Sequence, residues 1–428
     1  MKKRTLLGLL ALVPMVWLAG CGGSSGGNAS VRLVNASSGY ASLDLYVADT
    51  IQQTGVATGA AGSFASVSSG TVTTALAATT NSTYLLSQSR NFAKDTKYSV
   101  VAYGWQGGLR SVVLTENIAA ADANKTKVGI LNTATDAGSL DVYLTGDTDL
   151  LSASTPVATA ITGGSQSSYA AVVSGTYRLR VTATNNTNDV RLDVHGVTLG
   201  STEVDTIVLS AGAGGLLVNA SQVVQGGSVT AYNNNQARVR VVSALTGAGD
   251  RNSVTVNGTP IVVNAPSPAI SAYTLVNAGS AAITGTVTGT QALAAGSDTT
   301  LMVLGTAAVP TLAVIADDNR VPTSTTGVKL RLVNAMDPTT MAAYPLTMAL
   351  DYSAVASNVT PGAQSAYALL PSTTTSILEV SSALQAATMY SPTNGLNTLT
   401  LSAQSVYTVF MFGTATPGQW SGSLRKER

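Results

Sequence analysis

Apolar and polar residues alternate with a period of two through much of the chain. Residues 43–47 read Leu-Asp-Leu-Tyr-Val, and residues 140–144 read Leu-Asp-Val-Tyr-Leu. Neighbouring side chains of an extended strand point to opposite faces. The pattern therefore predicts half-buried strands whose apolar side chains face a core, with Asp44 and Tyr46 pointing outward.

Four other segments are apolar almost without interruption, which is typical of strands with little solvent on either face. They are residues 98–103, 207–209, 301–304 and 407–412. Helical periodicity is almost absent, and only in the Ala-rich stretch 118–123 do we expect a turn or two of helix. The chain is therefore predicted to be all-β.

A short motif recurs along the sequence, and its copies begin 97, 111 and 91 residues apart. The copies are residues 31–36 (VRLVNA), 128–133 (VGILNT), 239–244 (VRVVSA) and 330–335 (LRLVNA). Each spacing suits one antiparallel β-sandwich of about 100 residues. We therefore predict four tandem β-sandwich domains in a string.

Polar, turn-rich segments mark the expected borders of these domains. They are residues 116–127, 222–237 and 316–328. The expected domains are residues 30–122, 123–232, 233–322 and 323–428. Because the links are short, neighbouring domains should touch or nearly touch, in a rod or a curved string.

The N-terminus carries a targeting signal. A positive stretch, residues 2–4, precedes an apolar stretch, residues 6–18, that is shorter than the about 20 residues needed to span a bilayer. Residues 1–20 are therefore expected to be a signal peptide. The sequence Leu-Ala-Gly-Cys ending at Cys21 resembles the lipobox of bacterial lipoproteins. The resemblance implies cleavage before Cys21, lipid on Cys21, and a Gly/Ser tether over residues 21–29; an ordinary signal peptide that contains a cysteine is the alternative.

The lipid is expected to be the only membrane anchor, because no later segment reaches 18 consecutive apolar residues. Residue 22 is Gly, whereas the sorting pattern of bacterial lipoproteins uses Asp there for retention at the inner membrane. The resemblance thus implies a cell-envelope protein at the outer membrane, on its periplasmic face or at the cell surface.

Composition excludes several classes of function. Only 10% of the residues are charged and 5% are aromatic, and the chain has one cysteine and one histidine. These single residues exclude a disulfide framework and any metal site that needs two histidines or a Cys/His cluster. The formal net charge of +1 gives no electrostatic reason to expect a nucleic-acid partner. No cofactor is expected.

The residues with candidate chemistry have simpler interpretations. His195 lies two residues after Asp193, on the same outward face of a strand, and is expected to be an exposed strand-end histidine. Acidic residues gather at Asp141, Asp147 and Asp149, and at Asp317, Asp318 and Asn319. Neither group has the spacing of an EF-hand loop, so solvated turns are expected, with calcium in the links as the alternative.

Two residue types recur at fixed positions of the opening motif. Asn35, Asn132 and Asn334 share one position, and Arg32, Arg240 and Arg331 share another. A ligand or interface role is one interpretation. The simpler interpretation is that the asparagines cap a turn and the arginines point outward for solubility.

These motifs together resemble a known but uncharacterised family. The pattern Val-Arg-x-x-Asn-Ala-Ser, then Leu-Asp-Leu-Tyr-Val, then a Tyr-x-Val-Val strand ending in Gly is similar to a repeat domain of bacterial secreted and envelope proteins. The resemblance covers residues 31–420, although Ser243 departs from it in the third copy. It implies an immunoglobulin-like or transthyretin-like sandwich and no catalytic residue.

The sequence thus predicts a lipid-anchored envelope protein that presents tandem β-sandwiches for structural or interaction roles, such as adhesion or scaffolding, without catalysis. Its expected partners are the membrane, through the lipid, and an envelope protein or polysaccharide. The alternative is a module that binds a polysaccharide or another ligand, with Trp105 and Trp420 as the remaining tryptophans. A hydrolase is the third interpretation.

Overall fold

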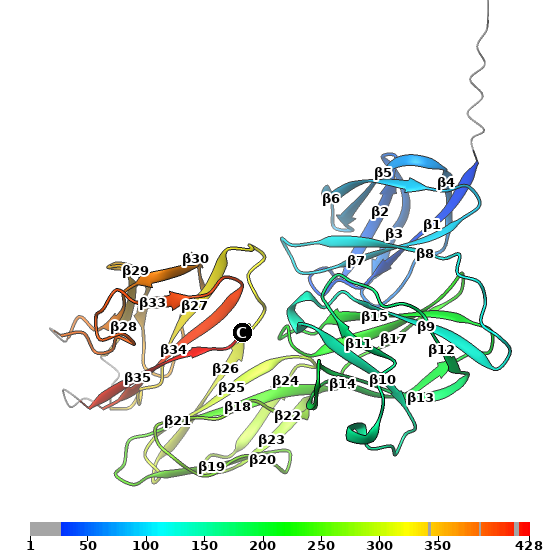
Figure 1. Cartoon of the computed structure of the whole chain (residues 1–428). Coiled ribbons are helices and arrows are strands. Elements are labelled where there is room, and N and C mark those ends of the chain that lie inside the picture. Colours follow the sequence, from blue (N-terminus) through cyan, green and yellow to red (C-terminus); the bar gives the residue numbers. More distant parts are fainter. Residues whose placement is uncertain (1–26, 341–343, 385–386, 415–418) are drawn as a thin grey trace, which may run out of the picture.

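The computed structural model describes residues 27–340, 344–384, 387–414 and 419–428. Cys21 and the predicted signal peptide lie outside the described residues. The all-β prediction is confirmed, and the sheets form β-sandwiches in series along the chain (Figure 1). Residues 118–123 form no helix, and the described residues contain two short 3₁₀ segments, η1 (Thr135–Ala137) and η2 (Leu151–Ala153).

Each of the four units has two main sheets. In spatial order, the strands of unit 1 are β4 (Ala65–Ser68), β1 (Asn28–Asn35), β7 (Lys97–Tyr103) and β8 (Arg110–Thr115) in one sheet, and β3 (Thr50–Ala57), β2 (Ser42–Val47), β5 (Gly70–Ala78) and β6 (Asn81–Phe92) in the other. Those of unit 2 are β12 (Ala170–Val173), β9 (Lys125–Asn132), β15 (Val204–Ala211), β16 (Val218–Val224) and β17 (Val229–Tyr232), and β11 (Ala158–Ile161), β10 (Leu140–Thr145), β13 (Gly175–Ala183) and β14 (Asn186–Leu199).

Units 3 and 4 follow the same plan. Unit 3 has β21 (Ala269–Ile270), β18 (Gln236–Leu245), β25 (Asp298–Gly305) and β26 (Pro310–Asp317), with β22 (Thr274–Asn277) also on β18, and β20 (Thr259–Pro266), β19 (Arg251–Val256), β23 (Gly279–Gly285) and β24 (Gly289–Leu293). Unit 4 has β30 (Ala368–Pro371), β27 (Gly327–Asn334), β34 (Ser405–Gly413) and β35 (Trp420–Lys426), and β29 (Ser353–Val359), β28 (Leu346–Leu350) and β32 (Leu378–Ser381), with β31 (Thr373–Ser376) paired to β33 (Leu399–Leu401).

One sheet of each unit contains the recurring motif, and we call it the interface sheet. In it the opening strand (β1, β9, β18 or β27) lies beside the closing strand (β7, β15, β25 or β34), and the two run parallel. All other strand pairs are antiparallel among the described residues. The period of two predicted the strands but not this parallel pair, because direction depends on partners far along the chain.

The acidic residues of the alternating strands are covered rather than exposed. The solvated turn predicted for Asp141 is therefore wrong, and Asp44, predicted to point outward from the core, is buried as well. Asp44 and Asp141 are 7% and 3% exposed. Asp44 accepts the backbone N–H of Gly55, and Asp141 accepts that of Ala160. Both of those residues have positive φ at an irregularity in the next strand, which turns their N–H groups toward the carboxylate.

The predicted turn-capping role of the recurring asparagines is confirmed. Asn35, Asn132 and Asn334 are fully buried. The Nδ2 group of each donates to two backbone carbonyls, and each Oδ1 accepts the backbone N–H two residues further on. In unit 3, Ser243 takes this position and accepts a hydrogen bond from Asn252.

The interface sheets pack against each other in pairs, unit 1 with unit 2 and unit 3 with unit 4. Between units 1 and 2 the buried apolar side chains are Val34, Ala36, Val101, Leu114, Leu131, Val208 and Val223. Between units 3 and 4 they are Val242, Ala244, Met302, Leu304, Ile315, Val333, Ala335, Phe410 and Phe412. This packing covers the second face of the closing strands, whose predicted burial is confirmed.

Of the two expected shapes, the rod is wrong. The string curves back, so that Gln404 and Arg428 of unit 4 line the same pocket as Trp105 of unit 1. In Figure 1 the C-terminus accordingly lies near the middle of the molecule, between unit 4 and the first two units.

Candidate functional site

A cluster of buried, paired charges lies between units 3 and 4. Arg240 and Arg331 are each 1% exposed, so the prediction that they point outward for solubility is wrong. Both arginines lie on the face of their strand that points away from the core of their own unit, but the neighbouring unit covers this face of the sheet. A buried guanidinium is tolerated there because it is paired with carboxylates.

The contacts of the two arginines are reciprocal across this interface. Arg240 of unit 3 donates to Glu427 of unit 4 at 2.7 Å, and Arg331 of unit 4 forms an ion pair with Asp317 of unit 3. Each Nε donates to a threonine of its own closing strand, Thr300 or Thr408.

Aromatic rings complete these two sites. The Arg240 guanidinium lies 4.6 Å from the ring centroid of Tyr273, and that of Arg331 lies 4.7 Å from the ring of Tyr367. Cation–π contacts of this kind strengthen when water is excluded. Burial raises the pKa of Tyr367 above its usual range, so its hydroxyl stays neutral beside Arg331.

The interface between units 1 and 2 contains half of this arrangement. Arg32 is 3% exposed, which again corrects the outward prediction. It donates to Ser99 at 2.7 Å and to Glu116 at 2.9 Å within unit 1, and to the carbonyls of Gly227 and Val224 in unit 2. The corresponding position of unit 2 is Gly129.

Tyr169 occupies the space of the missing arginine in unit 2. A Cβ atom on Gly129 would lie 2.8 Å from the Tyr169 ring. The Tyr169 hydroxyl makes a 2.7 Å hydrogen bond with Thr206, the closing-strand residue that lies opposite Gly129. In unit 3 the equivalent threonine, Thr300, lies opposite Arg240 and accepts the hydrogen bond of its Nε. The recurring position is therefore charged in three units and neutral in one.

The link between units 3 and 4 is held by a second set of ion pairs. Asp318 accepts hydrogen bonds from Arg320, and Lys329 donates to the carbonyl oxygens of Asp318 and Arg320. Burial raises the pKa of the Asp318 carboxyl, but the interactions with Arg320 and Lys329 outweigh this and bring it to about 2. This carboxylate binds protein donors rather than lying in the solvated turn that was predicted.

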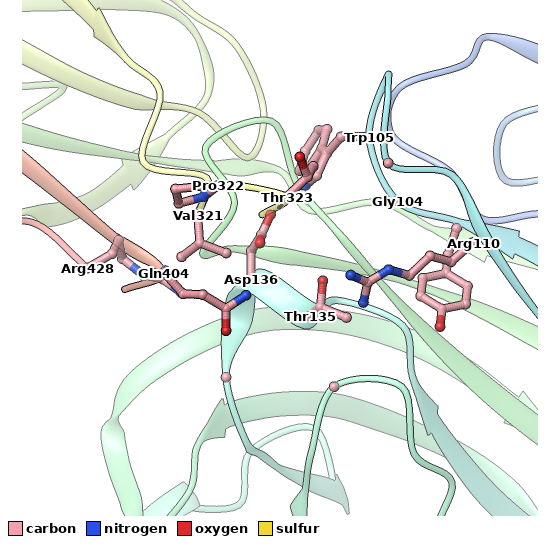
Figure 2. Close-up of a pocket in the computed structure, with 14 residues that line it drawn as sticks. Gly104, Trp105, Arg110, Thr135, Asp136, Val321, Pro322, Thr323, Gln404 and Arg428 are labelled. Atoms are coloured by element: carbon pink, nitrogen blue, oxygen red, sulfur yellow. Dashed lines mark hydrogen bonds between the residues drawn. The ribbon is translucent and has the colours of Figure 1, made fainter. Parts of the chain in front are cut away.

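A pocket of about 390 Å³ lies where units 1, 2 and 4 meet this link. Its lining residues are Tyr103, Gly104, Trp105, Gly108, Arg110, Thr135, Asp136, Gly138, Gly163, Val321, Pro322, Thr323, Gln404 and Arg428. Figure 2 shows Asp136 near its centre, with the Arg110 guanidinium pointing toward Thr135.

Trp105 joins three parts of the chain at this pocket. Its indole Nε1–H donates to the carboxylate of Asp136 in unit 2, and the Arg320 guanidinium of the link lies 4.5 Å from its ring centroid. Burial raises the pKa of Asp136, while the hydrogen bond from Trp105 and the charges of Arg428 and Arg320 lower it in part. The side chains that line the pocket thus include one carboxylate, Asp136, and two guanidinium groups, Arg110 and Arg428.

The other residues with candidate chemistry do not form a site. His195 is exposed, as predicted, but it pairs with Asp147, and Asp193 instead binds Arg178 at 2.7 Å. Asp149 accepts the backbone N–H of Gly146. Within the described residues, no group of three or more His, Cys, Asp or Glu side chains is placed to hold a metal ion. Cys21, the predicted lipid attachment site, lies outside these residues.

Sequence reasoning missed the pocket and the interface acids Glu116 and Glu427. The only available signal for the acids was their place at the end of the last strand of a unit. Trp105 and Asp136 belong to different units, and no motif links them.

Residues 29–143 match the model of a domain of unknown function (DUF4397), a stretch that covers unit 1 and the start of unit 2. No curated protein matches the sequence. No helix among the described residues is both long and apolar enough to cross a membrane.

Two solved structures show distant similarity. One is the Bacillus anthracis TIE protein, with 9% identity and a TM-score of 0.14, covering 65% of this chain and 49% of that one. The other is a product complex of the multi-modular glycogen-degrading pneumococcal virulence factor SpuA, with 8% identity and a TM-score of 0.16, covering 86% of this chain and 37% of that one. The chain thus spans about half the length of the first structure and less of the second.

Proposed function

We propose that this protein is a lipid-anchored scaffold of the bacterial cell envelope, which presents four joined β-sandwiches for interaction and does not catalyse a reaction. We further propose that all four units are repeats of the domain matched by residues 29–143. The shared strand order and the recurring asparagines support this extension.

The observation that supports a scaffold is the buried arginine system between paired units. Each of the three arginines, Arg32, Arg240 and Arg331, binds an acidic side chain and also a hydroxyl group on the closing strand of its own unit. For Arg240 and Arg331 the acid belongs to the neighbouring unit. Domains of one chain move relative to one another unless their interface is large and apolar, and buried apolar clusters lie at the same two interfaces as the arginines. A fixed arrangement of units suits a protein that holds surfaces at set positions.

Membrane anchoring is tested with Cys21→Ser, and Ser24→Ala in the tether is the matched control. Wild type and the control should partition into the detergent phase, whereas Cys21→Ser should stay in the aqueous phase. Equal partitioning of Cys21→Ser and wild type would show that the anchor lies elsewhere.

The scaffold role is tested by crosslinking in intact cells followed by capture of the full chain. The same envelope partner should be recovered with wild type and with His195→Ala, and recovery should fall when Arg331→Ala loosens unit 4. Turnover of a substrate in a hydrolase panel, abolished by His195→Ala, would contradict the non-catalytic proposal.

A further inference from the structure

The pocket between units 1, 2 and 4 has the size of a small-molecule site. Its volume of about 390 Å³ lies at the lower end of the about 300–1,000 Å³ typical of such pockets. Residues from three units and one link line it, and sites between domains are common positions for ligands. A single sugar-sized molecule fits this volume, whereas a folded partner does not.

Several hydrogen-bonding side chains face this pocket without a protein partner. Among the described residues, the side chains of Arg110, Thr135, Thr323 and Gln404 make no hydrogen bond or ion pair. The guanidinium groups at the unit interfaces are, by contrast, all paired with acids. Figure 2 shows the Arg110 guanidinium and the Gln404 amide on opposite sides of Thr135 and Asp136.

The turn before the closing strand fixes the position of Gln404. Each unit has a residue with positive φ in this turn, and the N–H of that residue donates to the carbonyl of the first residue of the opening strand. The four residues are Asp95, Thr202, Gly296 and Gln404. The fold itself therefore fixes the backbone conformation of Gln404 and directs the Gln404 side chain to the pocket. Because the backbone need not become ordered when a ligand binds, this arrangement favours binding.

The charges around the pocket favour a ligand with a single negative charge. Arg110 and Arg428 line it, against the carboxylate of Asp136, while Arg320 behind Trp105 is already paired with Asp318. Asp136 uses one oxygen to accept the Trp105 N–H, so its other oxygen is available to a ligand hydroxyl. Asp136 repels a phosphate dianion more strongly than a single carboxylate, and hydroxyl groups on the same ligand can donate to Asp136 while its carboxylate faces Arg110.

We propose that this pocket binds a small hydroxylated carboxylate, the chemical class of the acidic monosaccharides. Arg110 binds the carboxylate through its planar fork of N–H donors. Gln404, Thr135 and Asp136 hydrogen-bond the hydroxyl groups. The site goes beyond the scaffold role, and it would join units 1, 2 and 4 more firmly when it is filled.

The test is isothermal titration of the full chain with glucuronate, glucose and inorganic phosphate. Glucuronate should bind and raise the melting temperature, while glucose and phosphate bind at least about tenfold more weakly. Arg110→Ala and Gln404→Ala should each weaken glucuronate binding by about tenfold or more. Arg251→Ala, which removes an exposed arginine of unit 3, is the matched control and should bind like wild type.

Four results would overturn the proposal. The first is no heat with glucuronate at about 10 mM, a concentration that would fill even a weak specific site. The others are equal binding of glucose, equal loss of binding in Arg251→Ala, and phosphate binding that exceeds glucuronate binding. None of these outcomes bears on Cys21 anchoring or on partner capture, so the site and the scaffold role fail separately.

Discussion

The two interfaces between paired units use the same sheets and the same recurring position, but they differ in charge. Between units 3 and 4, Arg240 and Arg331 reach across to Glu427 and Asp317 in a reciprocal arrangement. Between units 1 and 2, only Arg32 is present, and it reaches backbone carbonyls of unit 2.

The difference shows how one position can change from an ion pair to neutral packing without changing the fold. Gly129 removes the second arginine, and Tyr169 fills the space and takes over its hydrogen bond to the closing strand. Replacing a complete buried ion pair with well-packed neutral groups is often close to neutral in stability, whereas removing one partner is costly. The comparison therefore predicts unequal effects of single substitutions at equivalent positions.

The largest effect is expected for Arg331→Ala. It leaves Asp317 buried without its closest cation, and we expect a loss of about 3–5 kcal/mol in unfolding free energy. Hydrogen exchange of β27 and β34 in the full chain measures this loss, with Arg251→Ala as the exposed control. A loss no larger than that of the control would show that the 3–4 interface does not depend on this pair.

Arg32→Ala should have a smaller effect, about 2 kcal/mol. Glu116 keeps the hydrogen bonds from Ser99 and from the backbone N–H of Gly226, as Asp317 keeps those from Thr300 and Tyr273 in Arg331→Ala. The difference is that Arg32 contacts unit 2 only through backbone carbonyls, so its loss removes no ion pair across the interface. Hydrogen exchange of β1 and β16 reports on this interface. If Arg32→Ala costs more than Arg331→Ala, the ranking of the two interfaces is wrong.

Asp205→Asn is expected to stabilise the protein near pH 7. Asp205 is buried in unit 2 beside Gln222 and, unlike Asp317, forms no ion pair within the part of the chain that the structure describes; burial raises its pKa to about 6. The folded state holds the proton more tightly than the unfolded state, whose aspartate pKa is about 3.9, so stability falls as the pH rises from about 4 to about 6.

Asparagine carries no charge and removes this loss, so we expect a gain of about 1–3 kcal/mol at about pH 7 and almost none at about pH 4. Thermal melts of wild type and variant at both pH values measure the difference. A gain of equal size at both pH values would contradict the assignment to Asp205 ionisation.

The smallest effect is expected for Gly129→Ala. The added methyl group meets the Tyr169 ring, which must shift, at a cost of about 1 kcal/mol. Gly289→Ala is the matched control, because a Cβ there meets nothing within 4 Å. Equal melting temperatures for the two variants would show that Tyr169 moves freely and does not fill a fixed space.

The sequence predicted the parts of the fold that depend on local pattern. Alternation indicated the strands, and the turn chemistry of asparagine correctly assigned Asn35, Asn132 and Asn334. The arginines were assigned wrongly because a strand pattern distinguishes the core face of one unit from its other face, but not whether a second unit covers that face. Arg240 meets Glu427 across 187 positions of sequence.

The candidate pocket could not be predicted from local sequence patterns, for the same reason. Trp105, Asp136 and Gln404 belong to three different units, and each has an ordinary sequence context. Their meeting depends on the curvature of the whole string.

The parallel pairing of opening and closing strands affects how the chain folds as it is made. Val31 of β1 pairs with Tyr98 of β7, so the first strand has no central partner until nearly the whole unit has emerged. Contacts of such long sequence separation form slowly. Arg32 can bind its carbonyl partner Gly227 only after a further part of the chain has been synthesised, because Gly227 lies 195 residues away. During that interval the apolar face of unit 1 is uncovered, and this is the stage at which a chaperone would matter most for the new chain.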